Sequence, residues 1–244
     1  QSISRVGVLE VTATDTAALC GSAKTSALRR YGSVGITDSY MHDDATRILL
    51  GTIARIAAMH DKSMHPIMSL FDGHHVRVSV LLKKSKDEAT KWRDNIGYRI
   101  RSEPYHFAKL PEGKYSGPMW TGPIFDSDIA SRITKQKAIE LCSGKKEDYP
   151  DDWTELDIEH SRREIERSVV HISESAELLA KEHLLVAVND LGIAAQIKHI
   201  PSMKKLKAGL EERGFKMARC HMPEAMFATD ADWSTVLEIA RLAE

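Results

Sequence analysis

The feature that most constrains the fold is an apolar run followed at once by a polar loop, close to the start of the sequence. Residues Val6 to Val11 read VGVLEV, and the next residues are the Thr-rich TATDT. A short apolar run of this kind favours a buried parallel strand, and Thr and Asp are typical of the loop at its carboxyl end. We therefore expect an α/β protein.

Two helices are predicted after this strand. The stretch from Thr25 to Tyr31 suits a short helix that ends at Gly32. From Asp43 to His60 the apolar residues recur at helical spacing, and Arg47 and Arg55 lie outside the apolar stripe. Acidic residues at the start of this second helix favour its dipole, which supports the prediction.

A hairpin is predicted next. Residues 66–71 and 76–82 surround an Asp-Gly turn, and the second run alternates in polarity, as an antiparallel pair does. Residues 1–84 thus predict half of a doubly wound sheet. Because one strand without neighbours is unstable, we expect an upstream segment to complete the sheet, and we interpret the start QSISR as an internal position of a longer protein.

The remainder of the chain predicts an α+β region. Residues 102–124 are rich in Pro, Gly and aromatic residues and suit loops, and residues 144–159 are acidic. The expected elements are helices at about 160–182, 183–198 and 202–213, a strand at 215–220 and a helix from Asp232. A helix, a Pro-containing turn, a second helix and a strand occur in this order in a winged-helix-like unit.

Composition and charge argue against a membrane protein and favour a protein of a reducing compartment. No apolar run approaches the roughly 20 residues that span a bilayer, and three widely separated cysteines favour a reducing compartment such as the cytoplasm. Residues 1–101 carry 15 Lys and Arg against 10 Asp and Glu, whereas residues 102–244 carry 19 against 25. Only the first part therefore has the positive balance that a polyanionic partner favours.

Several segments, in the right order along almost the whole chain, resemble the tRNA guanine-26 N2-dimethyltransferase family. The segments are VTATDTAALCG (11–21), LRRYGS (28–33), YMHDDATRILLG (40–51), GPMWTGPIFD (117–126) and FKMARCHMPEAMFATDA (215–231). The chain departs from the family in two respects. SEPYHF has no cysteine where some members carry a Cys-rich pair, and Cys220 and Ala228 stand where the family has Thr and Lys.

The resemblance implies S-adenosylmethionine-dependent methylation of the exocyclic N2 of guanine 26 in tRNA, first once and then twice. It implies that residues 1–101 are the C-terminal half of a Rossmann-like class I methyltransferase domain, and that residues 102–244 are an α+β C-terminal tRNA-docking domain with a winged-helix-like unit. In the family, the catalytic Asp-Pro-Phe-Gly loop and the Gly-rich donor-binding segment precede this block. The upstream half would then bind the donor, and this chain alone is expected to be inactive.

The loop after the first strand is the candidate catalytic region. Asp15, flanked by Thr12, Thr14 and Thr16, follows a strand end, where ligand crevices of α/β sheets form. The functional interpretation is that this loop lines the pocket for a guanine flipped out of its stack. The alternative is that these side chains only satisfy loop amides, as short polar residues do in turns.

Basic residues form two candidate RNA-binding groups. The first group is Lys24, Arg29, Arg30 and Arg47, and the second is Lys198, Lys204, Lys205, Lys207, Arg213, Lys216 and Arg219, which oppose only Glu211 and Glu212 within residues 198–221. Both groups suit contacts with RNA phosphates. The alternative for each is a solvated surface without a ligand.

The remaining signals leave other functions open. The histidines show no ligand spacing, so we expect no metal site, and we expect Trp120 and the aromatic residues near it to pack rather than to stack on bases. A non-catalytic RNA-binding module derived from the methyltransferase is one alternative function. A DNA-binding winged-helix regulator is another, supported by the tail alone.

Overall fold

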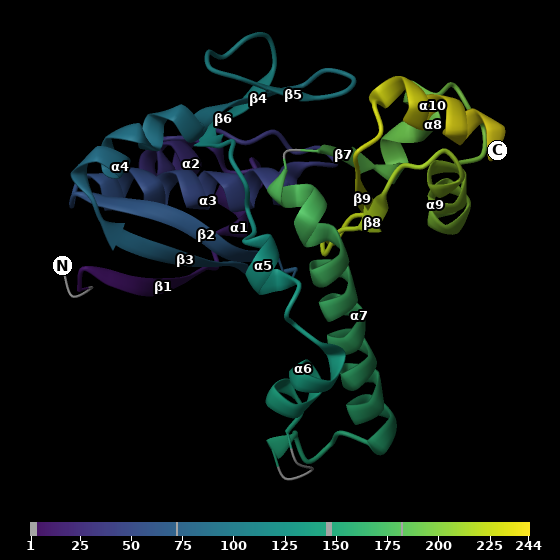
Figure 1. Ribbon diagram of the computed structural model, residues 1–244, viewed down its shortest axis with the longest axis horizontal. Coiled ribbons are helices and arrows are strands. Elements are labelled where there is room, and N and C mark those ends of the chain that lie inside the picture. The colour runs from purple at the N-terminus through teal and green to yellow at the C-terminus, as the bar shows by residue number, and fades with distance from the viewer. Residues whose placement is uncertain (1–3, 72, 145–147, 182) are drawn as a thin grey trace.

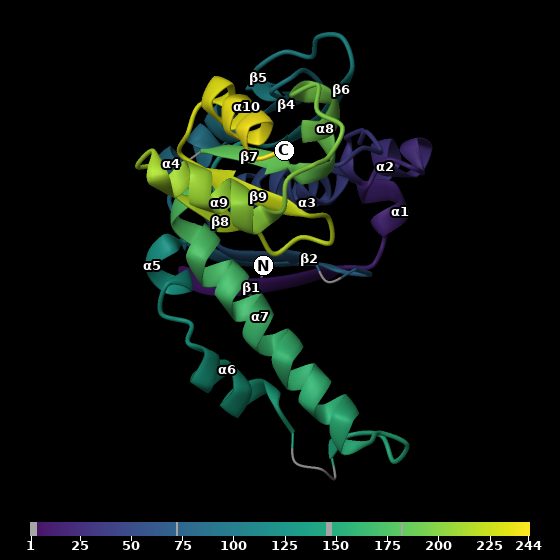
Figure 2. The ribbon, with the colours of Figure 1, turned by 90° about the vertical axis from the view of Figure 1, so that its right-hand side faces the viewer.

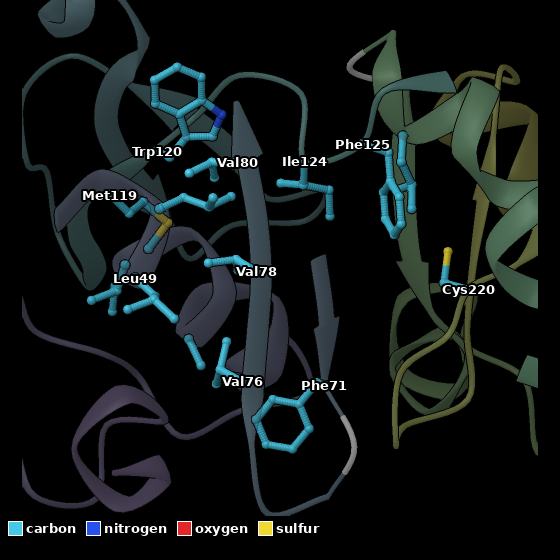
Figure 3. Close-up of a cluster of buried hydrophobic side chains, with 14 of the residues drawn as sticks. Leu49, Phe71, Val76, Val78, Val80, Met119, Trp120, Ile124, Phe125 and Cys220 are labelled. Atoms are coloured by element: carbon cyan, nitrogen blue, oxygen red, sulfur yellow. The ribbon is translucent and has the colours of Figure 1, made fainter. Parts of the chain in front are cut away.

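The alternating strand β3 (Val76–Lys84) organises the first sheet. The structure, a computed structural model, describes residues 4–71, 73–144, 148–181 and 183–244. In it, Val76, Val78 and Val80 are fully buried, and β3 pairs antiparallel with β1 (Val6–Ala13) on one side and β2 (Lys62–Phe71) on the other. Figure 3 shows these valines on the side of β3 that faces Leu49 and Met119. The predicted hairpin is thereby confirmed.

Strand β1 lies at one side of the first sheet. Among the described residues it pairs only with β3, and it therefore lies at the edge of the sheet, in the order β1-β3-β2. It runs parallel to β2, but β3 separates them. Val6 and Val8 are 56% and 55% exposed, so no described segment covers this part of β1, and the expectation that β1 is buried within a larger sheet stays a prediction. An apolar run indicates that a strand is buried by other residues, but it does not identify the segment that buries it.

Helix α3 (Met41–Ala58) forms the layer between two sheets (Figure 1). It packs against β2 and β3 on one side and against β6 on the other. The second sheet has the order β5-β4-β6, with β4 (Ile96–Ile100), β5 (His106–Ala108) and β6 (Tyr115–Trp120). Two short helices, α4 (Lys86–Thr90) and η1 (Lys91–Asn95), lead into it. The predicted helix is thus covered by a sheet on each side.

Two further short helices follow β1. They are α1 (Thr16–Leu19) and α2 (Lys24–Tyr31). The prediction that α2 ends at Gly32 is confirmed, because Gly32 adopts the left-handed conformation there.

The domain boundary expected after residue 101 does not coincide with a break in the structure. It falls between β4 and β5, which are paired strands of one sheet. One hydrophobic cluster also continues from Leu19 through Met119 to Met226. The division into two domains therefore stays a prediction, and the expected loop region 102–124 contains two strands.

A helical arm extends away from the two sheets, as Figures 1 and 2 both show. It follows α5 (Ser127–Ala130) and consists of α6 (Lys135–Cys142) and α7 (Glu155–Ala180). Thr154 and Asp157 form a reciprocal capping box, which starts α7 earlier than the predicted residue 160. Within the described ranges, no helix is long and apolar enough to cross a membrane.

The tail forms a third sheet with helices beside it. Its elements are β7 (Leu184–Ala187), η3 (Val188–Asp190), α8 (Leu191–Ala194), α9 (Met203–Glu212), β8 (Met217–Arg219), β9 (Met226–Thr229) and α10 (Trp233–Leu242). The sheet order is β7-β9-β8. The predicted helix 183–198 is wrong, because its first residues pair with β9 as a strand. Two helices followed by a hairpin are present, and the winged-helix-like interpretation stays a prediction.

A close crossing of two glycines supplies the first stability prediction. A Cβ on Gly21 (φ 87°) would lie 2.6 Å from the carbonyl carbon and oxygen of Gly35. We expect Gly21→Ala to lower the free energy of unfolding by about 1–2 kcal/mol through left-handed strain and by a further ~1–3 kcal/mol through overpacking. Urea denaturation measures this loss.

Gly32→Ala is the matched control for this prediction. Gly32 also has a positive φ (67°), but a Cβ there meets nothing within 4 Å. Only the strain of about 1–2 kcal/mol is then expected. Equal losses in the two variants would show that the Gly21–Gly35 crossing does not restrict the side chain.

Candidate functional site

The candidate site lies at the edge of the first sheet where β1 and β2 end. Ala13, the last residue of β1, is paired with Val76, and Val76 is paired with Phe71, the last residue of β2. Since β1 and β2 are both antiparallel to β3, their carboxyl ends meet at the same edge. Ligands of α/β sheets bind outside such carboxyl ends.

The loop after β1 directs the Asp15 carboxylate toward α2. The backbone carbonyl of Asp15 accepts hydrogen bonds from the amides of Ala18 and Leu19 at 3.1 Å each, whereas its side chain does not cap α1. The carboxylate instead forms an ion pair with Arg30. Thr14 is exposed and Thr16 is half-buried. The structure thus brings Asp15 and Arg30 together, and Asp15 is partly accessible at the strand end.

A half-buried His–Glu pair lies at the end of β2. Nδ1 of His42 is 2.6 Å from a carboxylate oxygen of Glu224, and the His42 ring centroid is 4.0 Å from that of Phe71. The pair links the start of α3 to the loop between β8 and β9. No sequence pattern around Glu224 indicates this contact by itself. The available signal was that His42 and Glu224 both lie in segments that carry the family resemblance.

Cys20 is close to this pair but is not suited to nucleophilic chemistry. Burial, with the nearby carboxylates of Glu224 and Asp44, raises the pKa of the Cys20 thiol to about 12. The thiol is therefore protonated at neutral pH, and only the thiolate is a strong nucleophile.

Two buried arginines form ion pairs with acidic residues at the start of α3. Arg99 donates to Asp44 through Nε and Nη2 at 2.6 Å each and to Asp38 at 2.9 Å. Burial raises the pKa of Asp44 to about 6, and the hydrogen bonds from Arg99 oppose this shift. Arg47 donates to Asp43 at 2.7 Å and to the Gly122 carbonyl at 3.1 Å. These pairs tie α3 to the second sheet.

The expectation that Arg47 lies on an exposed face is wrong. Its side chain is 7% exposed, and its guanidinium stands 4.9 Å from the centroid of the Phe107 ring. An arginine in this position stabilises the junction between α3 and the second sheet and cannot reach an RNA phosphate without leaving its ion pair.

Most tail cations are paired with carboxylates or carbonyls. Arg213 makes two hydrogen bonds of 2.8 Å to Glu238, Lys216 pairs with Glu177 at 3.1 Å, and Lys205 donates to the Ala243 carbonyl at 2.8 Å. Lys207 lies 3.9 Å from Glu211 and 4.0 Å from Glu174. Among the residues that the structure describes, Lys198, Lys204 and Arg219 are the exposed members of this group without an ion pair.

In the first group of cations, Arg30 and Arg47 are paired with carboxylates. Lys24 and Arg29 are exposed and form no ion pair within the described part of the chain. The predicted packing of the aromatic residues is confirmed, since Trp120 is 5% exposed and its indole N–H donates to the Pro123 carbonyl at 2.9 Å. In the described ranges, no group of three or more His, Cys, Asp or Glu side chains could hold a metal ion.

Comparisons with known proteins agree on one family. A sequence model described as "N2,N2-dimethylguanosine tRNA methyltransferase" matches residues 1–241. The tRNA (guanine(26)-N(2))-dimethyltransferase of Archaeoglobus fulgidus is 29% identical over 246 residues, which cover 96% of this chain and 62% of that protein. The Methanococcus maripaludis C6 enzyme of the same name is 28% identical over 97% of this chain and 58% of its own length. The chain thus spans about 60% of these relatives.

A solved structure shares the fold. It is the complex of Trm1 from Pyrococcus horikoshii with S-adenosyl-L-methionine, with a TM-score of 0.77, 24% sequence identity, and coverage of 98% of this chain and 60% of that one. The mixed α/β architecture expected from the sequence is therefore confirmed. Because the family match extends over nearly every residue, the chain belongs to the N2,N2-dimethylguanosine tRNA methyltransferase family.

Proposed function

We propose that this chain is the C-terminal part of a tRNA guanine-26 N2-dimethyltransferase, in which it forms one wall of the base pocket and docks the tRNA. The observation that carries the proposal is the meeting of two family segments, 182 residues apart, at the carboxyl edge of the first sheet: His42 lies 2.6 Å from Glu224 there. The Asp15 loop begins at the same edge, directly after Ala13. A flipped base needs a pocket with walls, and we propose that this edge supplies one of them.

The sheet itself supports a further segment beside β1. One edge of β1 has no strand partner within the described residues, and Val6 and Val8 are more than half exposed. Unpaired strand edges and exposed apolar side chains are normally covered in native proteins. We propose that the upstream half of the same protein covers them and supplies the S-adenosylmethionine site.

The loop after β1 does not by itself fit a donor site. Nucleotide-like cofactors are held by glycine-rich loops that lead from a strand into a helix amino terminus. The loop between β1 and α1 reads TD and contains no glycine. We therefore assign no donor contact to this chain, and we derive no step through the donor.

The low nucleophilicity of guanine N2 determines what the base pocket must provide. The N2 nitrogen of guanine is a poor nucleophile, because its lone pair is delocalised into the ring, so catalysis needs a proton acceptor and tight alignment. The family resemblance implies that the acceptor is the Asp of an Asp-Pro-Phe-Gly loop upstream. The Asp15 loop and the His42–Glu224 pair would then hold the base in place.

The test is a methyl-transfer assay on a protein that joins this chain to a family donor-binding half with an intact Asp-Pro-Phe-Gly loop. We expect methyl transfer to tRNA with guanine at position 26, and none when position 26 is adenine. Calorimetry on these 244 residues alone should detect no tight S-adenosylmethionine binding. An inactive joined protein that still binds tRNA would support the non-catalytic RNA-binding module instead.

A further inference from the structure

A groove lined by arginines lies between α2, α3 and the second sheet. We call it the arginine groove. It has a volume of about 440 Å³, and its lining includes Arg29, Arg30 and Arg55, with the aromatic side chains of Tyr31 and Trp92. The three cations come from the last turns of α2 and α3, and the other walls come from η1 and β6. Residues far apart in sequence thus converge on one positive surface.

The charge of the arginine groove is largely unopposed. No carboxylate contributes to its lining. Arg30 pairs with Asp15, whereas Arg29 and Arg55 are exposed and have no ion-pair partner in the part of the chain that the structure describes. The guanidinium of Arg93 adds a further cation close by, 5.8 Å from the centroid of the Trp92 ring. In the tail, by comparison, Lys207, Arg213 and Lys216 are paired with Glu side chains.

The floor of the arginine groove is held in place by backbone contacts. The Ser33 hydroxyl donates to the Pro118 carbonyl at 2.6 Å, and Val34 pairs with Gly117 as an isolated antiparallel bridge. Gly51 lets α3 approach β6 closely, because a Cβ there would lie 3.0 Å from the amide nitrogen of Trp120. A preformed groove loses little conformational entropy when it binds a ligand.

We propose that the arginine groove binds the sugar–phosphate backbone of the tRNA strand next to the target guanine. Guanidinium groups suit phosphate contacts, and aromatic surfaces suit the less polar sugar and base edges. Arg30 connects the arginine groove to the candidate site, because it lines the groove and forms an ion pair with Asp15 in the candidate site. The inference rests on the proposed function. It assigns the main contact between cations of this chain and tRNA phosphates to the α2–α3 face rather than to the tail.

The test compares two double variants with equal loss of charge. Arg29→Gln with Arg55→Gln removes the two unpaired cations of the groove. Lys137→Gln with Arg162→Gln removes two exposed cations of the helical arm. Binding of the full chain to a fluorescently labelled tRNA transcript is measured by anisotropy across a range of salt concentrations, and circular dichroism melts check that every variant is folded.

We expect the groove variant to bind tRNA about tenfold more weakly at ~0.1 M salt, and its log–log salt slope to fall by about 1.5, as for two lost phosphate contacts. The arm variant should stay within about twofold of the unmodified chain, and Arg29→Lys with Arg55→Lys should keep most of the affinity, since lysine also neutralises phosphate. If the groove and arm variants bind tRNA with equal affinity, the arginine groove is not a phosphate-binding surface. The proposed function still stands in that case. Absence of tRNA binding by the unmodified chain overturns the docking role and the groove together.

Discussion

Replacing Arg99 with leucine is expected to lower the free energy of unfolding by about 3–5 kcal/mol, the usual cost of leaving one partner of a buried ion pair alone. The Arg99 and Asp44 side chains are 1% and 0% exposed, and Asp44 receives two hydrogen bonds of 2.6 Å from Arg99. Leucine would leave the Asp44 carboxylate buried without a positive partner. Urea denaturation followed by circular dichroism measures the loss.

Arg213→Leu is the matched control, because it breaks an ion pair of similar geometry at the surface. Arg213 also makes two hydrogen bonds to one carboxylate, that of Glu238, but the two side chains are 35% and 57% exposed. Exposed pairs contribute about 0–1 kcal/mol. A loss below about 1 kcal/mol in Arg99→Leu would mean that water reaches Asp44 and that the pair is not a buried one.

The second large effect is expected on catalysis, from Asp15→Asn in the protein that joins this chain to a donor-binding half. In a pocket role, Asp15 aligns the flipped guanine with the methyl donor. Its loss should then lower kcat on the order of 10²-fold, because even a small misplacement of a reacting group slows the reaction by about that factor. Asparagine keeps the size of the side chain but removes its charge. The measurement is single-turnover methyl transfer at saturating tRNA, so that docking does not limit the rate.

Arg30→Gln separates the two interpretations of Asp15. This variant breaks the Asp15–Arg30 ion pair but leaves the carboxylate in place. A pocket role predicts that kcat falls far less in Arg30→Gln than in Asp15→Asn. A role in loop structure alone predicts similar losses in both variants, and that result would remove Asp15 from the pocket.

Local patterns predicted the elements whose boundaries depend on neighbouring residues. The end of α2 at Gly32 follows from the ability of glycine to adopt a positive φ. The start of α10 follows from the Asp232 side chain, which accepts a hydrogen bond from the amide of Thr235. The alternation of β3 likewise predicted an antiparallel strand. Each of these signals lies within a few residues of the feature it determines.

Predictions that depended on distant partners were less successful. The helical pattern placed Arg47 on the exposed side of α3, but carbonyls from Trp120 and Gly122 accept its hydrogen bonds in the interior. The RNA-binding role of the basic tail stays a prediction, but Glu177 on α7 and Glu238 on α10 neutralise two of its cations. Charge counted along a sequence does not reveal which ions are already paired.

The sequence by itself therefore determined the family, the α/β class, the central hairpin, the end of α2 and the start of α10, because these depend on motif order, periodicity and capping. Only the tertiary structure decided that β1 lies at an edge, that His42 meets Glu224, and that three arginines from two helices share one groove. The physical reason is that burial and ion pairing arise between residues far apart along the chain, and local spacing carries no information about which of them meet.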